Sequence, residues 1–160
     1  MTDDDLRGEA EEVRLRLAPK AKNARLIRLT VSALASRMAY SYDEIEDLRI
    51  AVGEVCGILL DPGLEPPNSM WPEEHDGADG PGGSDRGRPA GGDEEPPGAI
   101  EVVCNVWDSL LRVRTTRSPG GHRQEVSDLN RQILQSVTDE VEFDLTAENP
   151  SVTFSKARRD

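Results

Sequence analysis

The strongest constraint on this chain is a stretch of 38 residues, 61–98, dominated by glycine, proline and acidic side chains. It holds 9 of the 14 glycines, 8 of the 11 prolines and ten acidic residues, against two arginines. A segment of this composition cannot bury enough apolar surface to offset the entropy lost on ordering. We therefore expect 61–98 to be a disordered insertion in a single domain formed by 1–60 and 99–160. Within it, a role for Met70 and Trp71 stays open beside that of a solvated tether.

The charge of the chain restricts its partners. The 31 acidic and 19 basic residues give a net charge of -12, which repels nucleic-acid phosphates and anionic lipid. We expect no nucleic acid and no membrane as partner. The acidic N-terminus, Met1-Thr2-Asp3-Asp4-Asp5, is unlike a secretory signal, so we expect a cytoplasmic protein. Cys56 and Cys104 lie in apolar surroundings and His75 and His122 lack ligand-like neighbours, so no metal site is expected.

Hydrophobic periodicity before the insertion predicts a strand and two helices. Apolar and basic residues alternate over 13–17, the pattern of a half-buried strand. The first helix is predicted to start at Asn23 as its N-cap. Ser41 and Glu44 form a capping box at the start of the second helix. The second helix carries one apolar stripe, formed by Ile45, Leu48, Val52, Val55 and Leu59.

After the insertion the pattern predicts two strands, a helix and two further strands. Strands at 100–106 and 111–116 are joined at Asp108-Ser109 as a hairpin. Because each helix has a single apolar stripe, the expected fold is α+β, a two-layer sandwich with three helices on one face of a mainly antiparallel sheet. The stripe predicted for the third helix consists of Val126, Leu129, Ile133 and Val137.

Basic residues collect around the first predicted helix. Arg25, Arg28 and Arg37 lie on it, and Lys20 and Lys22 precede it. The first interpretation is an ordinary solvated helix face, and the second is docking of an acidic partner.

Three separated segments carry a resemblance to a known family. Residues 24–60 read ARLIRLTVSALASRMAYSYDEIEDLRIAVGEVCGILL and resemble the first two helices of anti-sigma-factor serine kinases of the RsbW and SpoIIAB type. Residues 99–116 and 128–156 are similar to the central hairpin and the last helix and strands of that family. The family belongs to the histidine-kinase-like (GHKL) ATPase superfamily. The resemblance therefore implies a Bergerat-type fold, with ATP and Mg²⁺ as cofactors where the site functions.

The resemblance also assigns roles in the second helix. The family carries a Glu that acts as general base and, four residues later, an Asn that binds magnesium. In this sequence Glu54 stands at the base position and Ile58 at the Asn position. An aliphatic side chain cannot bind magnesium, which requires oxygen ligands.

The other two nucleotide motifs of the family are replaced. The adenine-binding Asp-x-Gly corresponds to Thr115 and Arg117, and the phosphate-binding Gly-x-Gly corresponds to Asp128 and Asn130. A threonine lacks the charge-assisted hydrogen bond of a carboxylate. Losing the glycines removes the bare backbone amides that cradle phosphate.

We therefore expect a regulatory protein similar to anti-sigma factors, with a degenerate ATP site and no cofactor. Its expected partner is a sigma factor or an antagonist protein, and a homodimer is compatible with the resemblance. One alternative is an active ATP-dependent serine/threonine protein kinase with Glu54 as base. The other is a non-catalytic scaffold or partner subunit.

Overall fold

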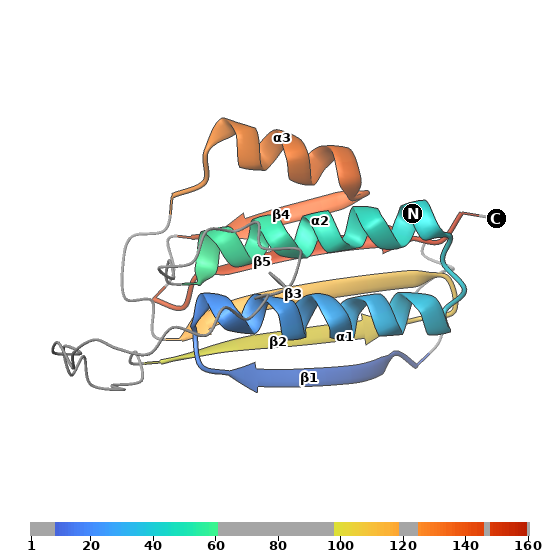
Figure 1. The fold of residues 1–160 in the computed structure, drawn as a ribbon, viewed down its shortest axis with the longest axis horizontal. Helices are drawn as coiled ribbons and strands as arrows, with labels where there is room; N and C mark the ends of the chain where they lie inside the picture. Colours follow the sequence, from blue (N-terminus) through green and yellow to red (C-terminus); the bar gives the residue numbers. More distant parts are fainter. Residues whose placement is uncertain (1–8, 61–97, 119–124, 146–147, 160) are drawn as a thin grey trace, which may run out of the picture.

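One sheet is built from strands on both sides of residues 61–97. The computed structural model describes residues 9–60, 98–118, 125–145 and 148–159. The strands lie in the order β1-β2-β3-β5-β4, and every neighbouring pair is antiparallel (Figure 1). Apart from Gly98, the predicted insertion lies outside the described residues. The strand bounds are β1 (Glu11–Leu17), β2 (Ala99–Val106), β3 (Leu110–Ser118), β4 (Glu140–Asp144) and β5 (Ser151–Ala157).

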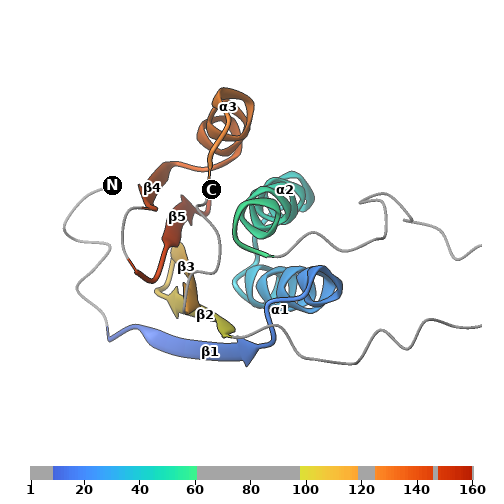
Figure 2. The ribbon, with the colours of Figure 1, turned by 90° about the vertical axis from the view of Figure 1, so that its left-hand side faces the viewer.

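Three helices cover one face of this sheet, as Figure 2 shows end-on. They are α1 (Ala24–Arg37), α2 (Tyr42–Leu59) and α3 (Asp128–Val137). Helix α2 packs between α1 and α3. The predicted two-layer α+β architecture is confirmed, and so is the hairpin between β2 and β3. Within the described ranges, no helix has both the length and the apolar composition that crossing a bilayer requires.

The three helices start in different ways. The capping box of α2 is present as predicted, with Ser41 and Glu44 each bonding the backbone N–H of the other. Asn23 occupies the predicted N-cap position of α1, but its side chain makes no capping hydrogen bond, and its backbone angles are helical (φ -77°, ψ -12°) because it ends a short 3-10 turn. Its Nδ2 donates instead to the carbonyl oxygen of Ala18 at 2.7 Å. Helix α3 is capped by Ser127, whose hydroxyl accepts from the backbone N–H of Asn130.

The core lies between the sheet and the helices. On α2, the predicted stripe is buried except for Ile45, which is partly buried. On α3, the predicted stripe is wrong at one position. Leu129, which was predicted to be buried, is 65% exposed, and Leu134, which was not predicted, is fully buried. Asn130 and Leu134 turn toward the rest of the molecule, and Leu129 is rotated away from them. The buried strand residues facing the helices include Ile100, Val102, Cys104, Leu111, Val113, Val152 and Phe154.

A buried carboxylate connects the start of α2 to the end of the chain. Glu44 accepts hydrogen bonds from the backbone N–H of Ser41 and of Arg159, each at 2.7 Å, and from the Ser41 hydroxyl at 2.8 Å. Burial alone would raise the pKa of Glu44. The hydrogen bonds from Arg159 and Ser41, with the charge of Lys156, outweigh burial and hold the pKa below its ordinary value.

We predict that Leu59→Ala lowers the free energy of unfolding by about 2–5 kcal/mol, because it leaves a cavity in the core. Leu59 is 0% exposed. Urea titration measures the change, and Leu129→Ala, at an exposed position, is the matched control. Equal midpoints for the wild type and Leu59→Ala would show that α2 does not pack on the sheet as described.

We also predict that stability depends on pH through Glu44. Because the folded state lowers the pKa of Glu44, its contribution is present above the unfolded-state pKa of about 4.5 and is lost as the pH falls through the folded-state pKa. The stability difference between the wild type and Glu44→Gln should therefore be largest near neutral pH and shrink below about pH 4.5. Urea titrations of both proteins at several pH values test this, and a constant difference would contradict it.

Candidate functional site

The residues assigned by resemblance come from three neighbouring elements. Glu54 and Ile58 lie one turn apart in the C-terminal half of α2. Thr115 and Arg117 lie near the end of β3, and Asn130 lies in the first turn of α3. Hydrogen bonds connect α2 to α3 and α2 to β3 at these positions. The structure therefore brings much of the predicted site together, with contacts that the sequence did not indicate.

Glu54 is bound by a residue of α3. The side-chain Nδ2 of Asn130 donates to Oε2 of Glu54 at 2.5 Å. Asn130 is in turn held by the N-cap of its helix, because its Oδ1 accepts from the Ser127 hydroxyl at 2.5 Å and its backbone N–H donates to that hydroxyl at 3.1 Å. We call Glu54, Asn130 and Ser127 the α2–α3 clasp. It fixes the Glu54 carboxylate and the start of α3 relative to each other.

Ile58 lies in the apolar core. Its side chain is 6% exposed and packs in the same cluster as Val55 and Leu59. The position at which the resemblance expects a magnesium ligand therefore carries no oxygen atom and faces hydrocarbon. Across the described ranges, no group of three or more His, Cys, Asp or Glu side chains is placed to hold a metal ion.

Arg117 connects the end of β3 to the end of α2. Its side chain is 2% exposed, and its Nη1 donates to the carbonyl oxygen of Leu59 at 3.0 Å. A cation at a helix C-terminus binds carbonyl groups that lack partners within the helix and interacts favourably with the helix dipole. The guanidinium therefore stabilises the last turn of α2. A sequence signal for this role exists, since Arg117 continues the inward alternation of Leu111, Val113 and Thr115 along β3.

Thr115 is part of the buried face of the sheet. It is 2% exposed and pairs in register with Val102 on β2 and Val152 on β5. It is therefore flanked by two buried valines at the position where the resemblance expects an adenine-binding carboxylate.

The two cysteines are unsuited to nucleophilic chemistry. Burial raises the pKa of Cys56 to about 12, although the nearby charge of Arg28 acts in the opposite direction. Burial also raises the pKa of Cys104 to about 11. Both thiols therefore stay protonated at neutral pH, and thiolate is the reactive form.

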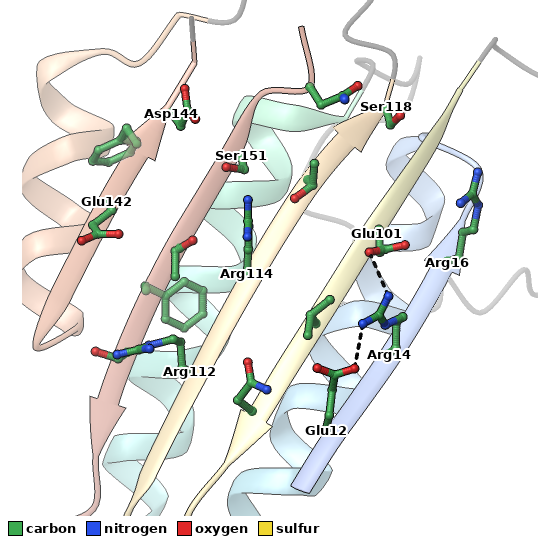
Figure 3. A pocket seen from close by; sticks show the side chains of 18 of the residues that line it. Glu12, Arg14, Arg16, Glu101, Arg112, Arg114, Ser118, Glu142, Asp144 and Ser151 are labelled. Carbon is green, nitrogen blue, oxygen red and sulfur yellow. Dashed lines mark hydrogen bonds and ion pairs between the residues drawn. The ribbon is translucent and has the colours of Figure 1, made fainter. Parts of the chain in front are cut away.

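A hollow of about 1060 Å³ lies on the opposite, helix-free face of the sheet. Figure 3 shows its charged lining, in which Arg14 lies between Glu12 and Glu101. The distances from the Arg14 guanidinium to these carboxylates are 2.7 Å and 3.7 Å. None of the residues assigned by resemblance lines this hollow. Its charged side chains come from the outward alternation of β1, β2, β3 and β4.

We predict that Glu54 and Asn130 are energetically coupled. In a double-mutant cycle with Glu54→Ala and Asn130→Ala, the unfolding free energies should be non-additive by about 0.5–3 kcal/mol, because either substitution alone removes the same hydrogen bond. Urea titration of the four proteins gives the coupling. Glu142→Ala combined with Asn130→Ala is the control pair, since no hydrogen bond joins these two side chains. Additive effects of Glu54→Ala and Asn130→Ala would mean that the α2–α3 clasp does not form in solution.

The chain is similar to known proteins in sequence. No family model matches the chain. It is similar to the serine-protein kinase RsbW of Bacillus subtilis, with 45% identity over 51 residues, 32% of each chain. The RsbW kinase of Bacillus licheniformis is 49% identical over 47 residues, 29% of each chain. That of Halalkalibacterium halodurans is 40% identical over 53 residues, 33% of each chain. The matched stretch thus spans about a third of the length of these curated relatives.

The fold agrees with a solved structure over nearly the whole chain. The crystal structure of the RsbU and RsbW domains of Rv1364c from Mycobacterium tuberculosis matches with a TM-score of 0.59 and 13% sequence identity. The match covers 96% of this chain and 34% of that chain. The predicted resemblance to RsbW-type serine kinases is therefore confirmed in sequence over about a third of the chain, and the fold agrees with that of an RsbW-containing structure over almost all of it.

Proposed function

We propose that this chain is a regulatory protein of the anti-sigma type that binds a protein partner and does not turn over ATP. The similarity to RsbW kinases supports the regulatory class. The observation that carries the loss of turnover is the hydrogen bond from Asn130 to the carboxylate of Glu54. The proposed partner is a sigma factor or an antagonist protein, which implies a role in transcription regulation and a cytoplasmic location. A homodimer is compatible with this proposal.

The surroundings of Glu54 argue against a general base. A general base must accept a proton from a hydroxyl or water that a metal-bound nucleotide positions. One carboxylate oxygen of Glu54 already accepts a hydrogen bond from the Asn130 side-chain amide. That amide is held in place by a hydrogen bond from the Ser127 hydroxyl. One helical turn further, Ile58 lies in the core and offers no metal ligand. The bond to Glu54 and the apolar side chain at position 58 both support a chain that does not carry out phosphoryl transfer.

The end of β3 supports the same proposal. The resemblance expects a glycine where Arg117 stands, because a nucleotide base must approach the backbone closely there. The Arg117 side chain instead lies buried against the last turn of α2. A nucleotide would have to displace this guanidinium from the Leu59 carbonyl group before it could bind.

An active kinase is the second candidate. The matched relatives are serine-protein kinases, and Glu54 is only half-buried. In this alternative Asn130 releases Glu54 when nucleotide binds. The bond to Asn130 would then be a resting contact rather than a permanent one.

We predict no measurable binding of Mg-ATP at millimolar nucleotide concentration, because the metal, adenine and phosphate contacts are all replaced. Isothermal titration calorimetry of the full chain tests this, with RsbW of Bacillus subtilis titrated in parallel as a comparison. The single substitution Ile58→Asn should not restore binding, since the adenine and phosphate contacts would still be absent. Micromolar binding, or phosphorylation of a partner that disappears in Glu54→Ala, would favour the kinase.

The partner class is tested by affinity purification from the native host. Recovery of a sigma factor or of its protein antagonist supports the proposal. If the chain recovers neither, the scaffold alternative is favoured.

A further inference from the structure

Helix α1 differs in charge from the rest of the chain. Between Ala18 and Tyr42 there are five basic residues and no acidic residue, although the whole chain has a net charge of -12. The first turn of α1 contains no acidic side chain, and no side chain caps its N-terminus. The positive end of the helix dipole therefore adds to the basic charge at this end of α1.

The outer side of α1 is also apolar. Leu26 is 45% exposed and Leu29 is 57% exposed, and Ala33 is exposed one turn further. A spacing of three and then four residues places these side chains in one row along the helix. No other described helix or strand covers this outer side (Figure 2). The opposite side of α1 already packs in the core through Ala24, Ile27, Val31, Leu34 and Ala35.

The basic residues beside this row have few partners in the part of the chain that the structure describes. There, Lys22 and Arg25 are exposed and make no ion pair. Within the same residues, Nε of Arg28 is buried and has no hydrogen-bond acceptor. By contrast, Arg37 at the other end of α1 is paired with Glu11 at 2.7 Å. Among the described residues, the basic charge of this region that has no ion pair therefore lies at and just before the N-terminal half of α1, next to Leu26 and Leu29.

We propose that the outer side of α1, formed by Arg25, Leu26, Leu29 and Ala33, together with Lys22 just before the helix, binds an amphipathic helix of a protein partner. The bound helix would carry an apolar stripe flanked by acidic side chains. The row of Leu26, Leu29 and Ala33 forms a ridge that fits the groove of a second helix. Lys22 and Arg25 select carboxylates at its edge.

Two features favour a protein helix over a polyanion. Exposed leucines require an apolar counterpart, which a nucleic-acid backbone lacks. The net charge of -12 repels extended anions such as nucleic acid and anionic bilayers, while a short acidic helix is attracted locally by α1. The identification of the partner as a sigma factor or antagonist rests on the proposed function, whereas the surface itself does not.

Two synthetic peptides of about 18 residues, or five helical turns, test the chemistry of the surface. Both have leucines at positions i, i+3 and i+7. One carries Glu and the other Lys at the flanking positions. Fluorescence anisotropy with the full chain should give binding of the Glu peptide at least about tenfold tighter than that of the Lys peptide, equivalent to about 1.4 kcal/mol. Equal binding of the two peptides, or no binding of the Glu peptide, would overturn the proposal.

Matched variants locate the binding. Leu29→Asp and Arg25→Glu should each weaken binding of the Glu peptide about tenfold or more. The controls Leu129→Asp, an exposed leucine of α3, and Arg114→Glu, an exposed arginine of the helix-free sheet face, should change it less than about twofold. All four positions are exposed, and circular dichroism checks that each variant is folded. Equal losses in the controls and in the α1 variants would refute a site on α1.

Other occupants give different results. If Leu29→Asp dissociates an oligomer of this chain in sedimentation velocity, the surface belongs to self-association, and the proposal is wrong. If vesicles containing phosphatidylserine or a single-stranded RNA bind through Arg25 more tightly than the Glu peptide does, the occupant is a polyanion, and the proposal is also wrong.

Partner recovery separates this proposal from the proposed function. If Leu29→Asp and Arg25→Glu recover a sigma factor or antagonist as well as the wild type does, the function stands and the α1 surface fails. If the peptides behave as expected but no such partner is recovered, the surface stands and the anti-sigma assignment fails.

Discussion

The structure depends on the burial of one face of the sheet under the helices. The central strand β3 pairs with β2 on one side and β5 on the other, so its inward residues Leu111 and Val113 have no access to solvent. Each such side chain contributes about 1.5–3 kcal/mol when it is removed from water. Helix α2 supplies much of the opposite layer through Val52, Val55 and Leu59. This apolar contact fixes where α2 lies, and with it the place of Glu54.

The positions assigned by resemblance to nucleotide chemistry take part in packing and helix termination. Ile58 belongs to the apolar cluster, Arg117 binds the last turn of α2, and Asn130 connects the N-cap of α3 to Glu54. Restoring a magnesium ligand at position 58 would place an amide among hydrocarbon, at a cost of about 1–3 kcal/mol. Each of these positions is therefore constrained by stability as well as by any interaction with a nucleotide. Because the packing of Ile58 and the hydrogen bonds of Arg117 and Asn130 are different contacts, a substitution that removes one of them leaves the other two in place.

Charge is distributed unevenly over the two layers. The helix-free face of the sheet carries arginines on β1 and β3 and carboxylates on β1, β2 and β4, with Ser151 and Thr153 of β5 between β3 and β4 (Figure 3). On the helix layer, α1 is basic, and α2 begins with acidic residues that favour its N-terminus. Although the chain has a net charge of -12, basic residues that have no ion pair within the described ranges lie beside exposed leucines on α1.

The sequence by itself determined the elements whose signals are local. The Ser41–Glu44 capping box, the apolar stripe of α2 and the hairpin between β2 and β3 each depend on residues within a few positions of one another, and all three are present. The single apolar stripe of each helix was also sufficient to predict the two-layer α+β fold, and three sequence segments were sufficient to show the resemblance to RsbW kinases.

Only the tertiary structure decided which polar groups meet. The Asn23 side chain donates to the carbonyl oxygen of Ala18 on the preceding segment and therefore does not cap α1. The rotation of α3 about its own axis exposes Leu129 and buries Leu134. This rotation depends on how the short helix packs on α2. Glu54 and Asn130 are 76 residues apart, and Arg117 and Leu59 are 58 apart. Periodicity and capping signals extend over only a few residues, so contacts between such distant residues exist only once the sheet has brought the two parts of the chain together.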